Sequence, residues 1–379
     1  MEGMDEQAIV ATGTGNELAL AGQVANEAAQ HHAFHDYHLR RSKNTIATHR
    51  AGLVAWVRYL QAVGAAGSLR HTAVSWVADN FDENGRNEIQ QYAEAINTSP
   101  LTVSAALYCQ SEPAAWTGTT WGLVEGFVKW LLNEGYSVAT VNQRLSSLKV
   151  YLRLATKAGV IPVEEHALMR EVRGYGRTEG KRVDERREQT RVGHKKAEAV
   201  VLTDAQVRQL KREHDDTPQG VRDRLLLCLF LDLGLRASEV AGLKCDDFAD
   251  GRVTVYRKKT DTTDTLQLSP DIIAAMQAYQ PYIRGEDTPL FRGSRKNKQL
   301  TNGNMSQRAI SNRIRLLGQD LLGVWELSPH DLRHTWATHA AKHNDPFALR
   351  DAGGWTNMQT PSRYVERRKV ANEGIELKY

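Results

Sequence analysis

The sequence predicts a mainly α-helical protein with two domains and a small β-hairpin in the second one. Three observations support this fold class: the length of the chain, the spacing of its apolar residues, and one short run of alternating residues. The 379 residues are enough for two or three domains of roughly 150 residues each. With 41% hydrophobic and 25% charged residues, the composition is that of an ordinary globular protein.

Residues 40–165 are predicted to form a helical domain. Apolar residues recur three and four positions apart in segments 53–60, 123–131 and 141–152, as they do on one face of a helix. A glycine follows shortly after the second and third segments, where helices commonly end. The simplest interpretation is that all three segments are helices packed into a core.

Residues 1–39 are predicted to be a flexible N-terminal segment. The first thirty are rich in Ala, Gly, Asn and Glu and contain few large apolar residues. The segment HHAFHDYH, at 31–38, contains four histidines that could bind a metal. Because no second group of ligands lies nearby in the sequence, we favour a solvated polar segment.

Residues 166–199 are predicted to be a basic linker between the domains. From 170 to 199, ten lysines and arginines stand against six acidic residues, and large apolar residues are almost absent. The alternative is a solvated loop without a partner.

Residues 200–379 are predicted to form the second domain. It begins with a pattern typical of a capping box, in which Thr203 starts a helix and Gln206 follows three positions later. The run LLLCLFLDLGL, at 225–235, predicts a buried helix. The run GRVTVYRKKTDTTDTLQLSP, at 251–270, predicts two strands joined by a polar turn.

Composition also limits the class of protein. The longest apolar run, 225–231, is far too short to cross a bilayer, and the first twenty residues lack the basic start of a secretory signal. Three cysteines without a C-x-x-C pair favour a reducing compartment, so we expect a cytoplasmic protein. A net charge of +4 and a pI near 8.8 are compatible with a nucleic-acid partner but do not establish one.

The segment LSPHDLRHTWATHAAKH, at 327–343, carries the strongest chemical signal. Ser328 and Pro329 predict a helix start, after which His330, Arg333 and His334 project to the same side. One interpretation is a zinc site resembling H-E-x-x-H. An aspartate in place of the glutamate, and an arginine beside the metal, both argue against zinc. A helix start of this kind is better suited to an anion.

Other candidate residues are ordinary when taken singly. Arg236 with Glu239 would be a surface ion pair of little energetic value. The lysines of RKKTDTTD would lie in a solvated turn. Trp355 and Tyr364 would be half-buried packing residues.

Taken together and in this order, these segments resemble the tyrosine recombinases, also called the phage integrase family. The resemblance is specific over residues 200–370 and weaker over 40–165. It implies a helical core-binding domain and a mixed α/β catalytic domain that form a clamp on DNA. The matching segments are GLRASEVAGL, the hairpin KKT, PHDLRHTWATH, GGWTN and TPSRY.

The resemblance implies a site-specific recombinase that cuts and rejoins DNA through a 3′-phosphotyrosyl intermediate, without metal or ATP. Arg236 and Arg333 would hold the scissile phosphate, because a guanidinium fork matches two phosphate oxygens. Tyr364 would be the nucleophile. His330 would act as an acid or base near neutral pH.

The remaining site residues would assist this chemistry. By resemblance, a hairpin lysine protonates the departing 5′ oxygen; we favour Lys259, with Lys258 as the competitor. Trp355, where many relatives carry histidine, would donate its indole N–H to the phosphate but could not exchange a proton. Glu239 would orient the cations, and His334 would support them without taking part in catalysis.

The resemblance also implies the partners: double-stranded DNA with a specific recombination site, and three further copies of the chain in a homo-tetramer on two duplexes. No cofactor is expected. Alternatives are a zinc hydrolase using His330, His334 and a third ligand such as His339, or an enzyme like a type IB topoisomerase. The choice between integration, excision and resolution stays open. Phosphate contacts are expected from Lys43, Arg144, Lys149, Arg295, Lys296 and Lys298.

Overall fold

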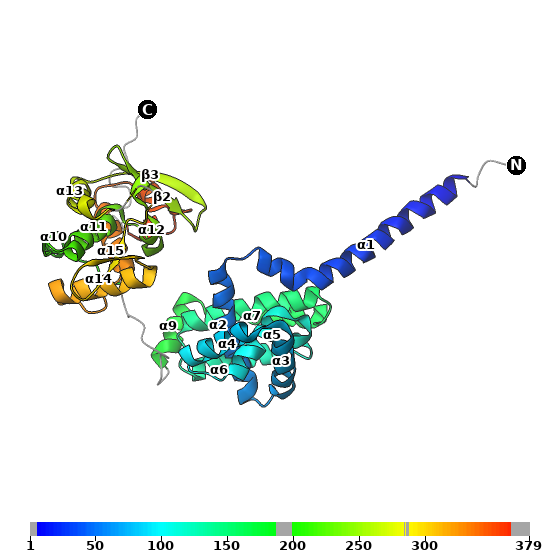
Figure 1. Ribbon diagram of the computed structural model, residues 1–379. Coiled ribbons are helices and arrows are strands. Elements are labelled where there is room, and N and C mark those ends of the chain that lie inside the picture. The colour runs from blue at the N-terminus through cyan, green and yellow to red at the C-terminus, as the bar shows by residue number, and fades with distance from the viewer. Residues whose placement is uncertain (1–5, 187–198, 284, 286–287, 365–379) are drawn as a thin grey trace. The chain divides into compact units, whose positions relative to one another are not determined.

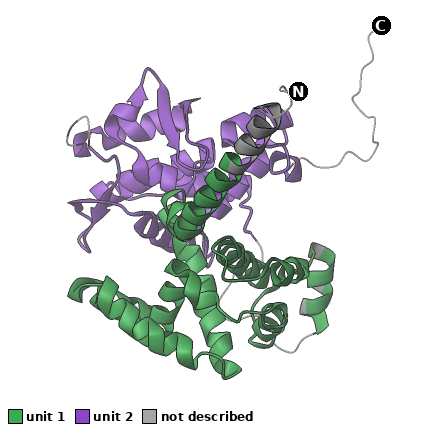
Figure 2. Cartoon of the chain, turned by 90° about the vertical axis from the view of Figure 1, so that its right-hand side faces the viewer, with its two compact units in different colours: residues 1–195 green, residues 196–379 purple. Residues whose placement is uncertain are grey.

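The computed structural model describes residues 6–186, 199–283, 285 and 288–364 (Figure 1). The chain divides into two compact units, residues 1–195 and 196–379, which Figure 2 shows in different colours. Helices dominate both units, and the short strands belong to the second unit. The mainly helical fold class predicted from the sequence is therefore confirmed.

The described residues of the first unit form helices and no strands. The apolar residues of the three predicted helices point into one core, where Trp56, Trp116 and Phe127 are fully buried. Its elements are α1 (Glu6–Leu39), α2 (Lys43–Ala62), α3 (Gly67–Asn80), α4 (Glu83–Ala95), α5 (Pro100–Ser111), the 3₁₀ turn η1 (Pro113–Trp116), α6 (Trp121–Asn133), α7 (Val138–Lys157), α8 (Val163–Glu171) and α9 (Arg177–Arg186).

Helix α7 illustrates how local sequence sets these elements. Ser137 begins it, with a side-chain oxygen that accepts from the Thr140 amide at 3.4 Å. Gly159 follows its end with φ of +77°, a conformation that glycine adopts without cost. The predicted end of this helix before Gly159 is confirmed.

Helix α1 corrects the prediction of a flexible N-terminal segment over 1–39 for residues 6–39. Its last turns pack against the core, where Phe34 is only 3% exposed and the Tyr37 ring stacks on His49 at 6.0 Å between centroids. His38 Nε2 lies 3.4 Å from the hydroxyl of Tyr151 on α7. The segment 31–38 is therefore the end of a packed helix, and its partners are too far away in sequence to be recognised.

Helix α8 places the first boundary later than predicted. Met169 and Val172, inside the predicted linker 166–199, are buried in the first core. Helix α9 follows, and residues 187–198 of the predicted linker lie outside the described residues.

The second unit surrounds helix α11, whose residues Leu225–Leu231 are buried on every side. Its elements are α10 (Asp204–Arg212), α11 (Pro218–Leu233), α12 (Ala237–Gly242), η2 (Cys245–Asp247), β1 (Phe248–Ala249), β2 (Arg252–Arg257), β3 (Thr262–Gln267), α13 (Pro270–Tyr279), η3 (Gln280–Tyr282), β4 (Arg292–Ser294), β5 (Leu300–Asn304), α14 (Gln307–Leu322), α15 (Pro329–Ala340), α16 (Pro346–Gly353) and η4 (Pro361–Arg363).

The strands form two small antiparallel sheets, with orders β1-β2-β3 and β4-β5. The predicted hairpin is confirmed: β2 and β3 pair with Val253 opposite Leu266 and Arg257 opposite Thr262. Alternation along β2 turns Val253, Val255 and Arg257 inward, because successive side chains of a strand point to opposite faces.

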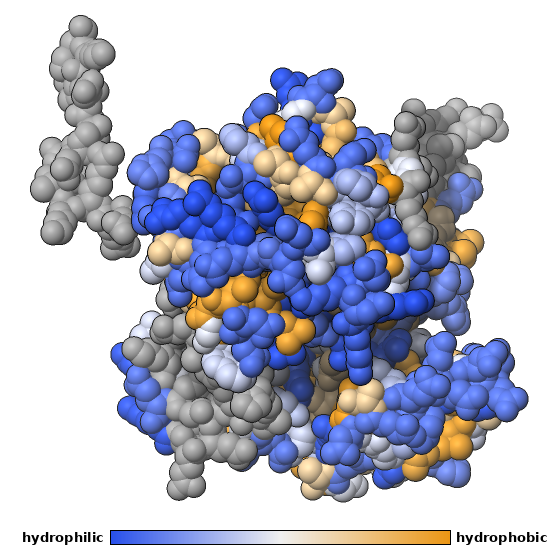
Figure 3. Space-filling model, turned by 60° about the vertical axis from the view of Figure 1, so that its left-hand side comes forward, coloured by the Kyte–Doolittle hydropathy of each residue, from blue (hydrophilic) through white to orange (hydrophobic). Residues whose placement is uncertain are grey.

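Apolar side chains are collected in these cores. The face shown in Figure 3 is mostly hydrophilic, with apolar residues in small separate patches. Among the described residues, we find no helix whose length and apolar character would let it span a bilayer.

Candidate active site

Helix α15 is held firmly at its start. The Ser328 and Asp331 side chains form a capping box, with Asp331 Oδ2 accepting from the Ser328 amide at 2.8 Å. The other carboxylate oxygen of Asp331 accepts from the Val200 amide at 2.9 Å. Asp331 is buried, and both of its carboxylate oxygens are used to fix the start of the helix. The general base of a zinc motif would instead face the metal-bound water.

Arg333 lies beneath the site, only 4% exposed. Its Nη1 donates to the Gly234 carbonyl and its Nη2 to the Gly353 carbonyl, each at 2.5 Å. The guanidinium also lies 4.7 Å from the centroid of the Trp355 ring, a cation–π contact. Burial lowers the pKa of Arg333 to about 10, so the side chain is still charged at neutral pH.

Arg236 lies at the start of α12 and is oriented by Glu239. The arginine Nη1 donates to Glu239 Oε1 at 2.6 Å, and its Nη2 donates to the Gly354 carbonyl at 3.1 Å. Glu239 is buried, whereas a quarter of the Arg236 side chain is exposed. The pair thus differs from a mobile surface ion pair, because one partner is fixed and the other can meet a ligand.

Tyr364 ends the short turn η4 and contacts α15. Its hydroxyl lies 2.8 Å from His334 Nδ1, and its ring stacks on Trp355 at 5.9 Å between centroids. Burial raises the pKa of the Tyr364 phenol, with Arg333 acting in the opposite direction. Thr360 precedes the turn and makes no side-chain cap.

The two histidines of α15 lie side by side. His330 Nε2 and His334 Nε2 are 3.0 Å apart, as residues four positions apart on a helix can be. Burial lowers the pKa of both imidazoles, and the charge of Arg333 lowers that of His330 further. His334, which we expected only to support the site, is the histidine that contacts Tyr364.

The structure thus brings most of the predicted site residues together, namely Arg236, Glu239, His330, Arg333, His334, Trp355 and Tyr364. Within the part of the chain that the structure describes, the two hairpin lysines make no such contacts. Lys258 and Lys259 are both exposed in the turn between β2 and β3. Among the contacts of the described residues, none joins either side chain to the site, so the structure does not choose between them.

Arg257 is a site residue that the sequence analysis missed. It is fully buried, and its guanidinium meets Asp264, Glu239 and the Ala352 carbonyl, the last at 2.9 Å. Arg257 therefore ties the hairpin to the carboxylate that orients Arg236. Its burial could have been inferred from the alternation of the strand, because Arg257 follows Val253 and Val255 on the inward face of β2. An apolar residue is normally found at such a position.

The carbonyls of Gly353 and Gly354 accept hydrogen bonds from the arginines of the site. Gly353 accepts from Arg333 and Arg257, and Gly354 accepts from Arg236. Gly354 has φ of +57°, and a Cβ there would lie 2.4 Å from Arg257 Cδ. A Cβ at Gly353 would meet the Trp355 ring at 2.4 Å. The glycine pair therefore allows backbone and cations to approach closely.

We expect Gly354→Ala to lower stability by about 1–2 kcal/mol, from the left-handed conformation alone, and to displace Arg236 and Arg257. Urea unfolding would measure the loss of stability. Gly242→Ala is the matched control, because nothing lies within 4 Å of a Cβ there. A Gly354→Ala protein that matched this control would contradict the expectation.

The geometry does not support the zinc alternative. His339, its suggested third ligand, has Nδ1 3.1 Å from Asp204 Oδ1. Within the described part of the chain, no three His, Cys, Asp or Glu side chains gather as a metal site would require.

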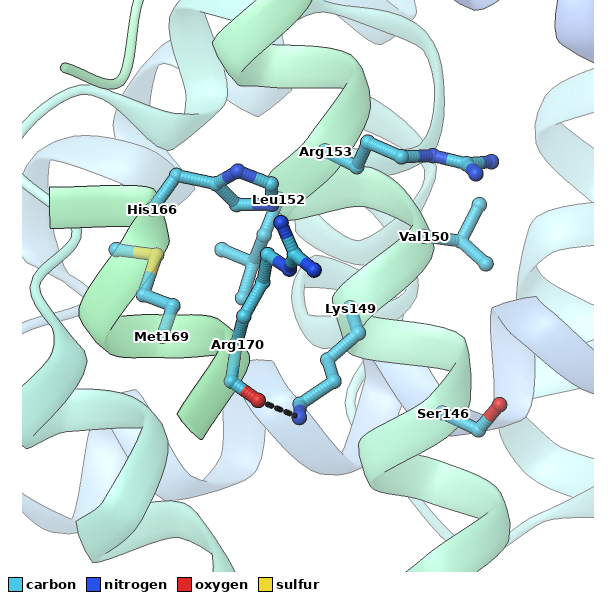
Figure 4. A pocket seen from close by; sticks show the side chains of 8 residues that line it. All are labelled: Ser146, Lys149, Val150, Leu152, Arg153, His166, Met169 and Arg170. Carbon is cyan, nitrogen blue, oxygen red and sulfur yellow. Dashed lines mark hydrogen bonds between the residues drawn. The ribbon is translucent and has the colours of Figure 1, made fainter. Parts of the chain in front are cut away.

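Three residues of the first unit were predicted to contact phosphate, and two of them already contact other groups within the unit. Lys43 is exposed at the start of α2. Arg144 lies 3.8 Å from the centroid of the Tyr136 ring. Lys149 donates to the Arg170 carbonyl at 2.9 Å and borders a hollow between α7 and α8 (Figure 4). The hollow is lined by Ser146, Lys149, Val150, Leu152, Arg153, His166, Met169 and Arg170.

The predicted contacts on the second unit lie in the turn between β4 and β5. Arg295, Lys296 and Lys298 are all exposed there. Lys298 forms an ion pair with Asp215.

Comparison with known proteins agrees with this geometry. Residues 200–370 match the model of the phage integrase family. The chain is 25% identical over 310 residues to tyrosine recombinase XerD of Pseudomonas aeruginosa, covering 80% of this chain and 92% of that protein. It is 24% identical over 281 residues to tyrosine recombinase XerC of Natranaerobius thermophilus, covering 71% and 86%.

A solved structure shares the fold. The chain resembles the XerH site-specific recombinase bound to a palindromic difH substrate, with a TM-score of 0.55 and 14% identity. The match covers 82% of this chain and 91% of that one.

Proposed function

Because this chain belongs to the tyrosine recombinase family, we propose that it cuts and rejoins double-stranded DNA at specific sites through a covalent link to Tyr364. The observation that carries the proposal is the contact of the Tyr364 hydroxyl with His334, at 2.8 Å, in the electric field of the Arg333 guanidinium. A phenol next to charged guanidinium groups has the parts needed to attack a phosphodiester and stabilise the charge that develops.

The proposed reaction begins when Tyr364 Oη attacks the scissile phosphorus. The bond from phosphorus to the 5′ oxygen breaks, leaving a 3′-phosphotyrosyl link and a free 5′ hydroxyl. Arg236 and Arg333 would stabilise the non-bridging oxygens, and Trp355 would position one of them. Lys259, or else Lys258, would protonate the leaving oxygen. Because the tyrosyl ester preserves the phosphate ester bond energy, rejoining requires no ATP.

The direct test is to trap the covalent intermediate. The protein would be incubated with a DNA duplex that carries its recombination site and is nicked so that the released 5′ end diffuses away. We expect a protein–DNA product that survives denaturation, with the DNA attached to the peptide containing Tyr364. An attachment at another residue, or cleavage without attachment, would contradict the proposal.

The hollow between α7 and α8 offers a surface for the DNA backbone. It combines Lys149, Arg153 and Arg170 with His166 (Figure 4). Arg153 also borders a second hollow next to α1. In the described part of the chain, no ion pair engages Arg153 or Arg170. We propose that these side chains contact phosphates when DNA binds.

Replacing both Arg153 and Arg170 with glutamine is expected to weaken DNA binding uniformly across sequences. The slope of log affinity against log salt should fall by about 2, because each lost phosphate contact removes roughly 0.9. Binding titrations over a range of salt would measure this slope. Lys129→Gln is the control, because Lys129 already pairs with Glu125 at 2.9 Å. An unchanged slope in the double variant would exclude this surface.

The proposal also covers how copies of the protein assemble on DNA and which DNA product they form. We propose a homo-tetramer on two duplexes, in which the two domains of each copy form a clamp on DNA and a 5′ hydroxyl from the other duplex attacks the tyrosyl ester. The setting would be the cytoplasm. Analysis of the DNA products would separate this reaction from that of a type IB topoisomerase, because only strand exchange joins two different duplexes.

A further inference from the structure

Behind Tyr364 lie two imidazoles in series. The Tyr364 hydroxyl is 2.8 Å from His334 Nδ1, and His334 Nε2 is 3.0 Å from His330 Nε2. The rings of the two histidines are nearly perpendicular, with centroids 4.4 Å apart. Half-buried Tyr364 is thus joined to exposed His330 through one intervening ring.

The attack on phosphorus requires the phenol to lose its proton. Burial raises the pKa of Tyr364, so the phenolate is scarce at neutral pH. Burial lowers the pKa of His334 and His330 below the ordinary value, so both are mostly neutral there. A neutral imidazole with a free ring nitrogen can accept the proton.

We propose that His334 takes the proton of Tyr364 as the phenol attacks, and passes a proton on to His330. This relay rests on the proposed function, since it assigns the base for the same tyrosine. It gives His334 a direct part in the reaction and makes His330 the group that carries the proton toward solvent.

The proton balance is simple. The O–H bond of Tyr364 breaks, and its proton binds His334 Nδ1. The N–H bond at His334 Nε2 breaks in turn, and that proton binds His330 Nε2, which becomes an imidazolium. No oxidant or metal enters the step, and His330 can return the proton by the same route when the strand is rejoined.

The charges around the relay favour a neutral resting state. Arg333 on α15 and Arg236 on α12 both disfavour a proton on His330. Asp331 acts in the opposite direction on both histidines, but its carboxylate is already bonded to the Ser328 and Val200 amides. On the turn that carries the tyrosine, Arg363 lowers the pKa of Tyr364.

A simpler role for His334 would be to hold the phenol in place. His334→Asn separates the two roles, because the amide oxygen can still accept from Tyr364 but cannot carry a proton. The experiment is single-turnover cleavage of a nicked DNA substrate, measured from pH 5.5 to pH 9.5. His343→Asn is the matched control, since His343 is exposed just beyond the same helix.

We expect His334→Asn to cleave about 100-fold more slowly at pH 7, the lower end of what a general base contributes. The wild-type rate should level off at neutral pH and fall only at a pH lower than the ordinary imidazole value of about 6.5, because burial lowers the pKa of both histidines. The His334→Asn profile should lack this levelling off at neutral pH. Its rate should keep rising with pH until the pKa of the Tyr364 phenol is reached. His330→Asn should slow cleavage less and keep the dependence on pH, because Tyr364 can still give its proton to His334.

A His334→Asn protein with the wild-type rate and pH profile would overturn the relay, because holding the phenol would then suffice. The covalent product separates this failure from that of the proposed function. If the wild type forms the Tyr364 adduct while the variant is unaffected, only the relay fails. If the wild type forms no such adduct, the proposed function fails and the relay fails with it.

Discussion

Tyr364→Phe is expected to abolish covalent DNA cleavage while DNA binding is retained. The substitution removes only the hydroxyl, and the ring can still stack on Trp355, which lies 5.9 Å away between centroids. Loss of a covalent nucleophile commonly costs on the order of 10⁶-fold in rate. No adduct should therefore appear above background, at any pH.

The measurement pairs two assays on the same protein. A denaturing gel with a nicked substrate reports the adduct, and a binding titration reports affinity for the same site. Tyr282→Phe is the control, because it removes the hydroxyl of a half-buried tyrosine in the same unit, outside the proposed site. Adduct formation by Tyr364→Phe would refute the assignment of the nucleophile, whereas loss of DNA binding would show that the hydroxyl has a structural role.

Much of the fold could be predicted because its signals are local. Helix α15 begins at Ser328 and Pro329 as expected, and the strands β2 and β3 occupy the predicted alternating run. The apolar stripes of α2, α6 and α7 pack in the first core, where most of their residues are buried. In each case the chain contains its own cap, turn or periodic pattern within about twenty residues, so distant contacts were not needed to recognise it.

The site could be predicted in part for a different reason. Its residues occur in five short segments whose order matches a known family, so the candidates were found without any geometry. The contacts among them could not be foreseen. The sequence did not indicate that His334, and not His330, would touch Tyr364, because both project from the same side of α15 and only the position of η4 decides between them.

Long-range packing explains the other departures. Phe34 and Tyr37 are three residues apart, but their partner Tyr151 lies more than a hundred residues away. The end of α1 therefore looked solvated. Arg257 was hidden in the basic run RKK, which is typical of an exposed turn, although its register on β2 places it in the interior. Charged residues are rarely buried unless they are paired, and its partners come from distant segments.

Arg257→Met is expected to destabilise the second unit by about 3–5 kcal/mol, the usual result of breaking a buried ion pair. Methionine would fill much of the space but would leave Asp264 without its arginine. Glu239 would lose one of its two cations, and the Ala352 carbonyl would lose a donor at 2.9 Å. The effect should be local, because Arg257 joins β2 to β3, to α12 and to the end of α16.

Hydrogen exchange on the full chain would locate this loss. We expect the amides of β2, β3 and α16 to exchange faster, with those of α2 and α7 unchanged, since the first unit has its own core. Arg252→Met is the matched control, because Arg252 is an exposed arginine of the same strand. Cleavage should fall as well, because Glu239 orients Arg236 at 2.6 Å and Arg257 helps to fix Glu239. If Arg257→Met kept the protection and the cleavage rate of the control, the buried guanidinium would not be what joins the hairpin to the site.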